Sequence, residues 1–218
     1  PDGGNVGLHK HMAIAAAIST NASGKPIIEW LRQRGMRMLE EGSPSFNASM
    51  TKVMVNGAWV GVHPRPAWIA ETFKLHRRIG LIPLYTSIQW DIASQTIFIY
   101  TDSGRLMRPI FYVEDGKASY DTGMAKAKIE SGNYSWRELT TGFAKKKLER
   151  SDNSIFSVAD LYDAPDMKAL KGSQACIEYI DTAEEETALI AFLQDDLAKK
   201  PYTNVEIQIS SQNTDATT

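Results

Sequence analysis

The sequence has little of what marks a secreted, membrane-spanning or strongly charged protein. It contains a single cysteine, Cys176, so no internal disulfide can form and a reducing, intracellular compartment is expected. Because Cys176 lies in an apolar run, we predict a buried, inert thiol. The apolar run from Ala13 to Ile18 is too short for a signal sequence or a membrane span, so no membrane contact is expected. A formal net charge of -2 gives no overall field that would attract nucleic acid, so any basic surface must be local.

Motifs for catalysis and for metal binding are also missing from the sequence. It has no glycine-rich phosphate loop, no Cys/His zinc pattern, no nucleophile elbow and no Asp-x-Asp-x-Asp cluster. We therefore predict no catalytic residues, no metal site and no cofactor in this chain. The run Glu184, Glu185 and Glu186 could suggest a divalent-cation site, but consecutive helical residues point in different directions. We expect a solvated, structural run that binds no ion tightly.

What is present is the composition of an ordinary globular protein. The 218 residues are 43% hydrophobic and 23% charged, enough for one large or two small domains with real cores. The pattern predicts an α+β fold with antiparallel β-sheets, short packed helices and two small subdomains. The glycine-rich opening from Pro1 to Asn5 suggests a fragment cut from a longer protein. The polar residues 210–218 should form a disordered tail.

The stretch from Thr96 to Gly116 organises the expected fold. Two β-rich runs flank the turn Asp102-Ser103-Gly104, so we predict a β-hairpin. The arms carry apolar residues on both faces, which favours a central position in a sheet. Pro109 removes a hydrogen-bond donor from the second arm and indicates a bulge or an edge position. Arg105 and Arg108 are expected to be solvated arginines at the sheet edge.

Further local signals punctuate the chain. Asn56-Gly57 between alternating apolar residues predicts a type I′ hairpin turn, which needs positive φ at both positions. Pro66 should begin a helix that ends near Arg78, with its basic last turn serving as a solvated C-terminal cap and a nucleic-acid contact as the alternative. Ser135 and Glu138 form a capping-box pattern at the start of another helix. Strands are expected at 87–90, 174–181 and 202–209, and helices at 27–34, 157–162 and 166–171.

Two charged segments lie in the second half of the chain. Lys145, Lys146 and Lys147 follow the Ser135 helix, and such a run is usually a solvated helix face. Helix propensity alone makes residues 182–200 one helix.

Four stretches together resemble the second-largest subunit of multi-subunit DNA-directed RNA polymerases of the eukaryotic, archaeal and large-DNA-virus kind. They occur in the family's order. They are PDGGNVGLHKH at 1–11, VNGAWVGVH at 55–63, DIASQTIFIYTDSGRLMRPIFYVEDG at 91–116 and IEYIDTAEEETALIAF at 177–192. Asp2 stands where the family has Glu, and the segment from Lys117 to Asn153 matches poorly, so its basic residues inherit no role. The histidines flanking Lys10 are a variation that looks like large DNA viruses.

The resemblance implies a non-catalytic section of the polymerase. Residues 1–24 would be the end of the fork region, 25–116 an external 1-like domain and 117–209 an external 2-like domain. The resemblance also makes Thr187 to Phe192 a strand paired with Ile177 to Tyr179, and we follow it over helix propensity. The family's structural signature falls on Asn56, Gly57, Asp102, Gly104, Arg105, Arg108 and Pro109.

The resemblance also implies partners. Asp2, Asn5 and Lys10 would lie nearest to nucleic acid, with a tight structural loop as the alternative. The partners would be the largest and small polymerase subunits, the DNA template and the RNA transcript. By the same resemblance, the catalytic Mg of the assembled enzyme would be held by residues outside this chain. The location would be the nucleus, or a cytoplasmic viral factory or virion.

Two other functions compete with a polymerase section. Net charge and the missing motifs favour an independent protein-interaction module without enzymatic activity. The acidic run leaves room for an isolated hydrolase.

Overall fold

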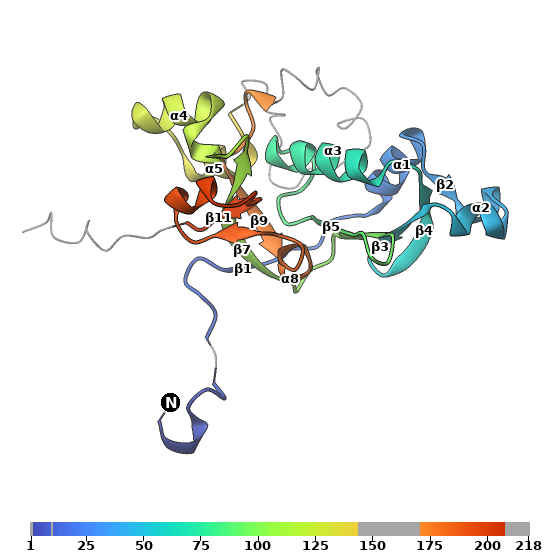
Figure 1. The fold of residues 1–218 in the computed structure, drawn as a ribbon, viewed down its shortest axis with the longest axis horizontal. Helices are drawn as coiled ribbons and strands as arrows, with labels where there is room; N and C mark the ends of the chain where they lie inside the picture. Colours follow the sequence, from blue (N-terminus) through green and yellow to red (C-terminus); the bar gives the residue numbers. More distant parts are fainter. Residues whose placement is uncertain (1, 10, 144–170, 208–218) are drawn as a thin grey trace, which may run out of the picture.

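The computed structural model describes residues 2–9, 11–143 and 171–207, and two β-sheets organise them (Figure 1). The predicted α+β class is confirmed. The five-stranded sheet has the order β2-β4-β3-β6-β5, with β2 at Arg37–Met38, β3 at Thr51–Val55, β4 at Ala58–His63, β5 at Ser87–Asp91 and β6 at Thr96–Tyr100. The six-stranded sheet has the path β1-β7-β11-β10, with β8 and β9 also paired to β7. Its strands are β1 at Ala17–Ile18, β7 at Leu106–Glu114, β8 at Lys117–Ala118, β9 at Ile177–Asp181, β10 at Ile190–Ala191 and β11 at Asn204–Val205.

Helices α1 (Lys25–Gln33) and α3 (Pro66–Arg78) cover one face of the five-stranded sheet, as Figure 1 shows. Each begins with a proline in its first turn, where the missing N–H costs no hydrogen bond. Trp30 and Phe73 of these helices pack in one core with Val53, Ile88 and Ile97 of the sheet. The predicted Pro66 to Arg78 helix is therefore confirmed. Shorter elements on this side of the chain are η2 (Leu39–Glu41) and α2 (Pro44–Ala48).

The Asn56-Gly57 turn joins β3 to β4 as the sequence predicts. Both residues have positive φ, 48° and 80°, and the strands pair antiparallel. Asn56 does more than turn the chain, because its Oδ1 accepts a hydrogen bond from Thr101 N at 2.8 Å and its Nδ2 donates to Thr101 Oγ1 at 2.9 Å. The turn therefore also fixes the point where β6 ends.

The hairpin predicted for Thr96 to Gly116 is wrong. β6 lies between β3 and β5 in the five-stranded sheet, so both of its edges are already paired. β7 instead enters the six-stranded sheet, and residues 101–105 carry the chain from one sheet to the other. Ser19 holds this crossing: its Oγ donates to Asp102 O and accepts from Arg105 N, both at 2.9 Å, while Gly104 N donates to Ser19 O. The expectation that both arms lie centrally in a sheet is nevertheless confirmed.

Pro109 creates neither the bulge nor the edge position that was predicted. β7 is an interior strand, and its register with β9 is unbroken from Met107 to Phe111. Arg105 O accepts from Ser19 N, and Val113 N donates to Thr203 O, so odd-numbered residues of β7 face the side of β1 and β11. On that side β1 pairs at 106–107 and β11 at 111–112. Because Pro109 faces the gap between them, its missing N–H costs no ladder bond.

Short helices and 3₁₀ turns pack around the six-stranded sheet. Ser135 caps α5 (Trp136–Thr141) through the predicted capping box with Glu138. Cys176 is buried beside Leu139 and Phe143, as expected. The other elements are η3 (Ser119–Asp121), α4 (Gly123–Glu130), α8 (Thr182–Glu185) and η4 (Gln194–Ala198). None of the helices in the described ranges is long and apolar enough to cross a membrane.

The segment after β9 was expected to be one helix by propensity, or a strand paired with residues 177–179 by the resemblance, and it is neither. It is not one helix, because α8 ends at Glu185 and a short strand, β10, follows at Ile190–Ala191. β10 pairs in parallel with β11 and not with β9, whose partner is β7. The implied strand therefore exists in shortened form with a different neighbour. The strand expected at 202–209 is limited to Asn204–Val205 in the described residues, and the helix expected at 157–162, most of the one at 166–171, and the triplet Lys145, Lys146 and Lys147 lie outside them.

The amino-terminal segment extends away from the two sheets until β1 joins β7 (Figure 1). It begins with the 3₁₀ turn η1 (Gly3–Asn5) and has no buried residue there. The expected boundary between the two domains lies at residue 116. Because the chain crosses at residues 101–105, β7 lies before that boundary but belongs to the six-stranded sheet.

Candidate functional site

The most highly connected polar site is a buried ion network where the end of α3 meets β9 and α8. Arg77 and Glu184 are 1% and 2% exposed, and both guanidinium nitrogens reach the carboxylate at 2.8 Å. Arg77 also donates to Glu178 at 3.0 Å and to Thr86 O at 2.9 Å. Lys74 lies 3.3 Å from Glu184. Burial alone would lower the pKa of Arg77, but Glu184 and Glu178 outweigh it and raise that pKa, so the charge is fixed.

Glu178 is the second carboxylate of the network. It accepts hydrogen bonds from Arg78 Nε at 3.0 Å, from Arg78 Nη2 at 3.1 Å and from Asn204 Nδ2 at 3.2 Å. Burial would raise the pKa of Glu178, but Arg78, Arg77 and Lys74 hold it well below its usual range. The solvated basic cap predicted for α3 is therefore wrong for Arg77 and Arg78. The residues next to them in the sequence give no sign that Glu178, on a strand of the other sheet, lies beside them in the fold.

A separate ion pair fixes the crossing between the sheets. Arg105 Nη1 lies 2.7 Å from Asp181 Oδ2 and donates to Ser87 Oγ at 2.8 Å. Its Nη2 donates to Tyr85 O at 2.6 Å, and its Nε lies 3.1 Å from Asp102 Oδ1. Asp181 is 2% exposed and Arg105 is half-buried at 15%, so Arg105 ties β5 to β9 and is not the solvated edge arginine that was predicted.

Arg108 also differs from that prediction. It is half-buried and pairs with Glu185 at 2.5 Å and with Glu206. Hydrogen bonding to Glu206 is the main cause that raises the pKa of Arg108. The three consecutive glutamates were expected to be solvated, and this is wrong for two of them. Glu184 is buried, Glu185 is half-buried and Glu186 is exposed.

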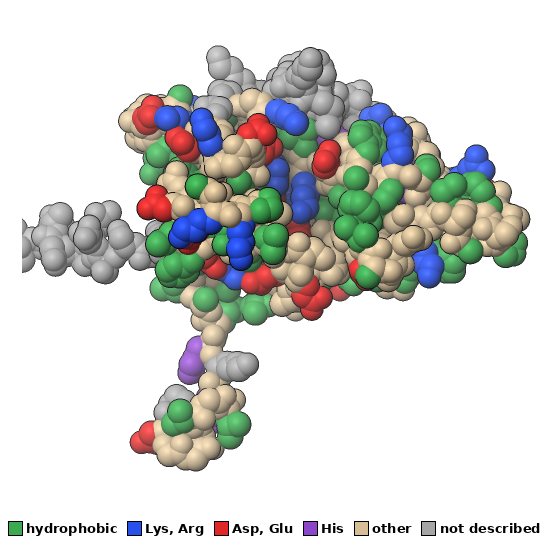
Figure 2. Space-filling view, in the orientation of Figure 1, with side chains coloured by type: hydrophobic (Ala, Val, Ile, Leu, Met, Phe, Trp, Pro, Cys, Tyr) green, Lys and Arg blue, Asp and Glu red, His purple; other side chains and the backbone are tan. Residues whose placement is uncertain are grey.

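This arrangement can hold elements together, but it offers no free acid or base. Each buried carboxylate already accepts from at least one guanidinium, which leaves its charge neutralised and its oxygens occupied. No group of three or more His, Cys, Asp or Glu side chains in the described ranges is placed to hold a metal ion. Figure 2 shows Lys and Arg side chains in the hollow beside α3, between the two halves of the molecule. These ion pairs connect the two sheets, and we call them the ion lock. Its members are Arg77, Arg78, Arg105, Glu178, Asp181 and Glu184.

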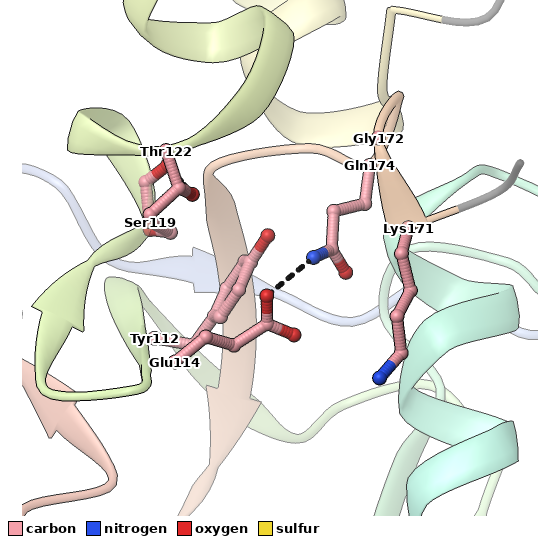
Figure 3. A pocket seen from close by; sticks show the side chains of 7 residues that line it. All are labelled: Tyr112, Glu114, Ser119, Thr122, Lys171, Gly172 and Gln174. Carbon is pink, nitrogen blue, oxygen red and sulfur yellow. Dashed lines mark hydrogen bonds between the residues drawn. The ribbon is translucent and has the colours of Figure 1, made fainter. Parts of the chain in front are cut away.

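A polar pocket of about 250 Å³ lies next to the lock (Figure 3). Glu114 connects the two, since its carboxylate accepts from Gln174 Nε2 at 2.9 Å and lies 3.7 Å from Arg78 Nη1. The Arg78 guanidinium stacks 3.6 Å from the ring centre of Tyr112. Lys171 lies across the pocket from Glu114, and Gln174 Oε1 is buried without a hydrogen-bond partner in the described part of the chain. One water molecule would satisfy that oxygen.

The other residues singled out from the sequence lie apart from the lock. Asp2 and Asn5 are exposed on the amino-terminal segment, and Lys10 lies outside the described residues. Sequence reasoning missed Ser19 and gave no buried role to Arg77, Glu178, Asp181 or Glu184. One signal was available in the sequence: Glu178 lies between Ile177 and Tyr179 in a run that was expected to be a strand.

Two family models match the chain. The model of RNA polymerase Rpb2, domain 4, matches residues 53–114, and that of RNA polymerase Rpb2, domain 5, matches residues 172–218.

Curated relatives match over nearly the whole chain. The DNA-directed RNA polymerase II subunit RPB2 of Meyerozyma guilliermondii is 32% identical over 203 residues, which is 90% of this chain and 15% of the relative. The same subunit of Schizosaccharomyces pombe is 33% identical over 201 residues, again 90% and 15%. DNA-directed RNA polymerase II subunit 2 of Arabidopsis thaliana is 30% identical over 202 residues, or 91% and 14%. The chain thus spans about 15% of the length of these relatives.

Proposed function

Because the chain belongs to the family of RNA polymerase Rpb2, the second-largest polymerase subunit, we propose that it is a non-catalytic scaffold section of such a subunit that contributes to DNA-templated transcription. The observation that supports this most directly is where the lock lies. Its arginines, Arg77, Arg78 and Arg105, fall inside the stretch matched by the first family model, and its carboxylates, Glu178, Asp181 and Glu184, fall inside the second. A scaffold needs this rigidity between neighbouring domains.

We further propose how the section is divided. Residues 1–24 form the end of the fork, 25–116 an external 1-like domain and 117–209 an external 2-like domain, with 210–218 as a tail. β7 belongs to residues 25–116 but pairs with β9 and β11 of residues 117–209, so the two units share a sheet, which supports their acting as one body. The largest and small polymerase subunits are the proposed protein partners, and the magnesium chemistry of the assembled enzyme is assigned to residues outside this chain.

Two measurements test the scaffold role. The purified chain should neither extend a primer nor hydrolyse nucleoside triphosphates, whereas the complete subunit, tagged and isolated from its natural source, should bring down the largest subunit. Magnesium- and template-dependent incorporation by this chain alone would overturn the non-catalytic assignment. Recovery of the tagged subunit without a largest subunit would favour the rival function, an independent protein-interaction module. Imaging of the same tag tests the location, for which we propose the nucleus; a cytoplasmic viral factory is the alternative.

We propose that any contact with nucleic acid runs through the amino-terminal segment around Asp2, Asn5 and Lys10. This segment extends away from the sheets and carries glycines that let backbone approach a ligand closely. In the assembled polymerase, Lys10→Ala should weaken retention of transcript or template. The matched control replaces Lys145, Lys146 and Lys147 together by alanine and should leave elongation nearly unchanged. Crosslinks from RNA or DNA to the triplet, with Lys10→Ala behaving as wild type, would reverse the assignment.

A further inference from the structure

The five-stranded sheet has a second face, and no core cluster of the described residues covers it. Val53, Val55, Ile97 and Ile99 point toward α1 and α3, so alternation along the strands turns their neighbours to the opposite side. We call this side the open face. Its central side chains do not pack against the core, and most are half-buried or exposed. They are Lys52, Met54, Trp59, Gln89, Phe98 and Tyr100.

The large side chains of the open face form one continuous row. Met54 pairs with Trp59 of β4 on one side and with Phe98 of β6 on the other, and Phe98 pairs with Gln89 of β5. Trp59 is 42% exposed. The rings of Phe98 and Tyr100 are nearly parallel, 3° apart, with centroids separated by 6.4 Å. Single exposed apolar residues are common on protein surfaces, but a row in which Met54 joins Trp59 to Phe98 and Tyr100 is typical of an interaction site.

The residue types fit a protein partner. Trp, Met, Phe and Tyr are the side chains enriched at the buried centre of protein interfaces, where Lys and Glu are depleted. The row extends across β4, β3, β6 and β5, so it suits the broad contact of another polypeptide better than a small ligand.

The charges around Tyr100 define the partner further. Asp181, Asp102 and Glu186 all act on Tyr100, and Arg105 is the cation that opposes them. The charge of Arg105 offsets that of its buried partner Asp181, so the exposed Asp102 and Glu186 leave this end of the face negative. Asp102 is 53% exposed there. At the other end, Lys52 and Asp91 flank Thr96 on neighbouring strands, so their charges offset each other. A negative end repels phosphates and disfavours nucleic acid, whereas it attracts Lys or Arg, which also stack on aromatic rings.

We propose that the open face docks a protein segment that places an apolar side chain over Met54 and Phe98 and a Lys or Arg side chain at the Tyr100 end. The Tyr100 end of this surface borders the ion lock at Arg105 and Asp181, whereas Trp59, Met54 and Phe98 take no part in the lock. Docking on this surface does not depend on the scaffold role. It adds a protein-binding site to the scaffold role and the nucleic-acid contact proposed above.

Photo-crosslinking in the complete natural subunit tests the proposal. The probe is p-benzoylphenylalanine in place of Phe98, with the same group in place of Glu71, an exposed residue of α3 outside the open face, as the matched control. The Phe98 position should give a protein crosslink that the Glu71 position lacks, and the crosslinked peptide should contain Lys or Arg near an apolar residue. The proposal is overturned by crosslinks only to nucleic acid, by crosslinks to a second copy of the subunit, by a peptide without a basic residue, or by equal yields at both positions.

Truncation variants give a second readout. Phe98→Ala and Trp59→Ala should each weaken binding of the crosslinked peptide at least tenfold, with unchanged melting temperature confirming the fold. Trp136→Ala removes an equally large side chain, 56% exposed on α5, and should leave binding unchanged. Equal effects of all three variants would contradict the proposal. Copurification of the largest subunit is scored in the same preparations, so failure of docking is distinguished from failure of the scaffold role.

Discussion

Arg77 and Glu184 are 107 positions apart in the chain and meet in a two-pronged ion pair, with both nitrogen–oxygen distances at 2.8 Å. Both side chains are at most 2% exposed, so water cannot solvate either charge if its partner is removed. A buried charge that loses its partner costs about 3–5 kcal/mol. We therefore expect Glu184→Gln to lower the free energy of unfolding by about that amount, measured by urea denaturation. Glu186→Gln, an exposed neighbour, should change it by less than about 0.5 kcal/mol.

Replacing both members of this pair should cost less than the two single changes together. In Arg77→Met with Glu184→Leu, neither charge is left without its partner, and Glu178 keeps its bonds to Arg78. We expect the double variant to be more stable than the sum of the single effects by at least about 1 kcal/mol. Additive single effects would show that the pair is not coupled and would contradict the lock.

The buried histidine of α3 should make stability depend on pH between neutrality and mild acid. Burial, together with the charge of Arg34, lowers the pKa of His76 to about 4, whereas in the unfolded chain it is about 6.5. Between these values the unfolded chain binds a proton that the folded chain does not, so the free energy of unfolding falls as pH is lowered through this window. The slope is up to about 1.4 kcal/mol per pH unit. Buried His63, whose pKa is also lowered, acts in the same direction.

His76→Gln should flatten this slope between pH 7 and 5.5, measured by thermal denaturation at each pH. The control His11→Gln changes an exposed histidine and should leave the slope as it is. An NMR titration that places the His76 ring at a pKa of 6.5 or above would contradict the prediction.

The type I′ turn predicts the effect of a single substitution. Gly57 has φ of 80°, and no atom lies within 4 Å of the position where a Cβ would stand. A side chain there causes no clash, so the free-energy cost of a substitution comes from the backbone conformation alone. Gly57→Val should lower the free energy of unfolding by on the order of 1 kcal/mol or more, because a β-branched residue resists positive φ. Gly57→Asn should cost less. Equal melting temperatures for wild type and Gly57→Val would contradict this account.

Cys176 should be unreactive while the chain is folded. It is 1% exposed, and burial raises its pKa to about 11. At pH 8 only about one thiol in a thousand would then be the reactive thiolate. We expect iodoacetamide to leave the native chain unmodified over hours and to label it at once in urea, as measured by mass spectrometry. Labelling of the native chain at the rate of a free cysteine would show that the thiol is accessible.

The sequence by itself determined those features whose causes lie within a few residues. Pro66 begins a helix because its own ring fixes φ, Asn56-Gly57 turns because both residues accept positive φ, and Ser135 caps with a glutamate three positions away. Collinear motifs also identified the family. Each of these signals is complete in a short window, and tertiary packing has no reason to override it.

Only the tertiary structure decided which strands pair and which charges are buried. Nothing local to the turn at Asp102 shows that β3 and β5 already occupy both edges of β6, so the chain must cross to another sheet. Likewise, Arg105 looks solvated until Asp181, 76 positions later, is brought to 2.7 Å from it. Long-range pairing depends on the edges and partners that the folded chain leaves available, and a charge is stable in the interior only where the fold delivers its counter-charge.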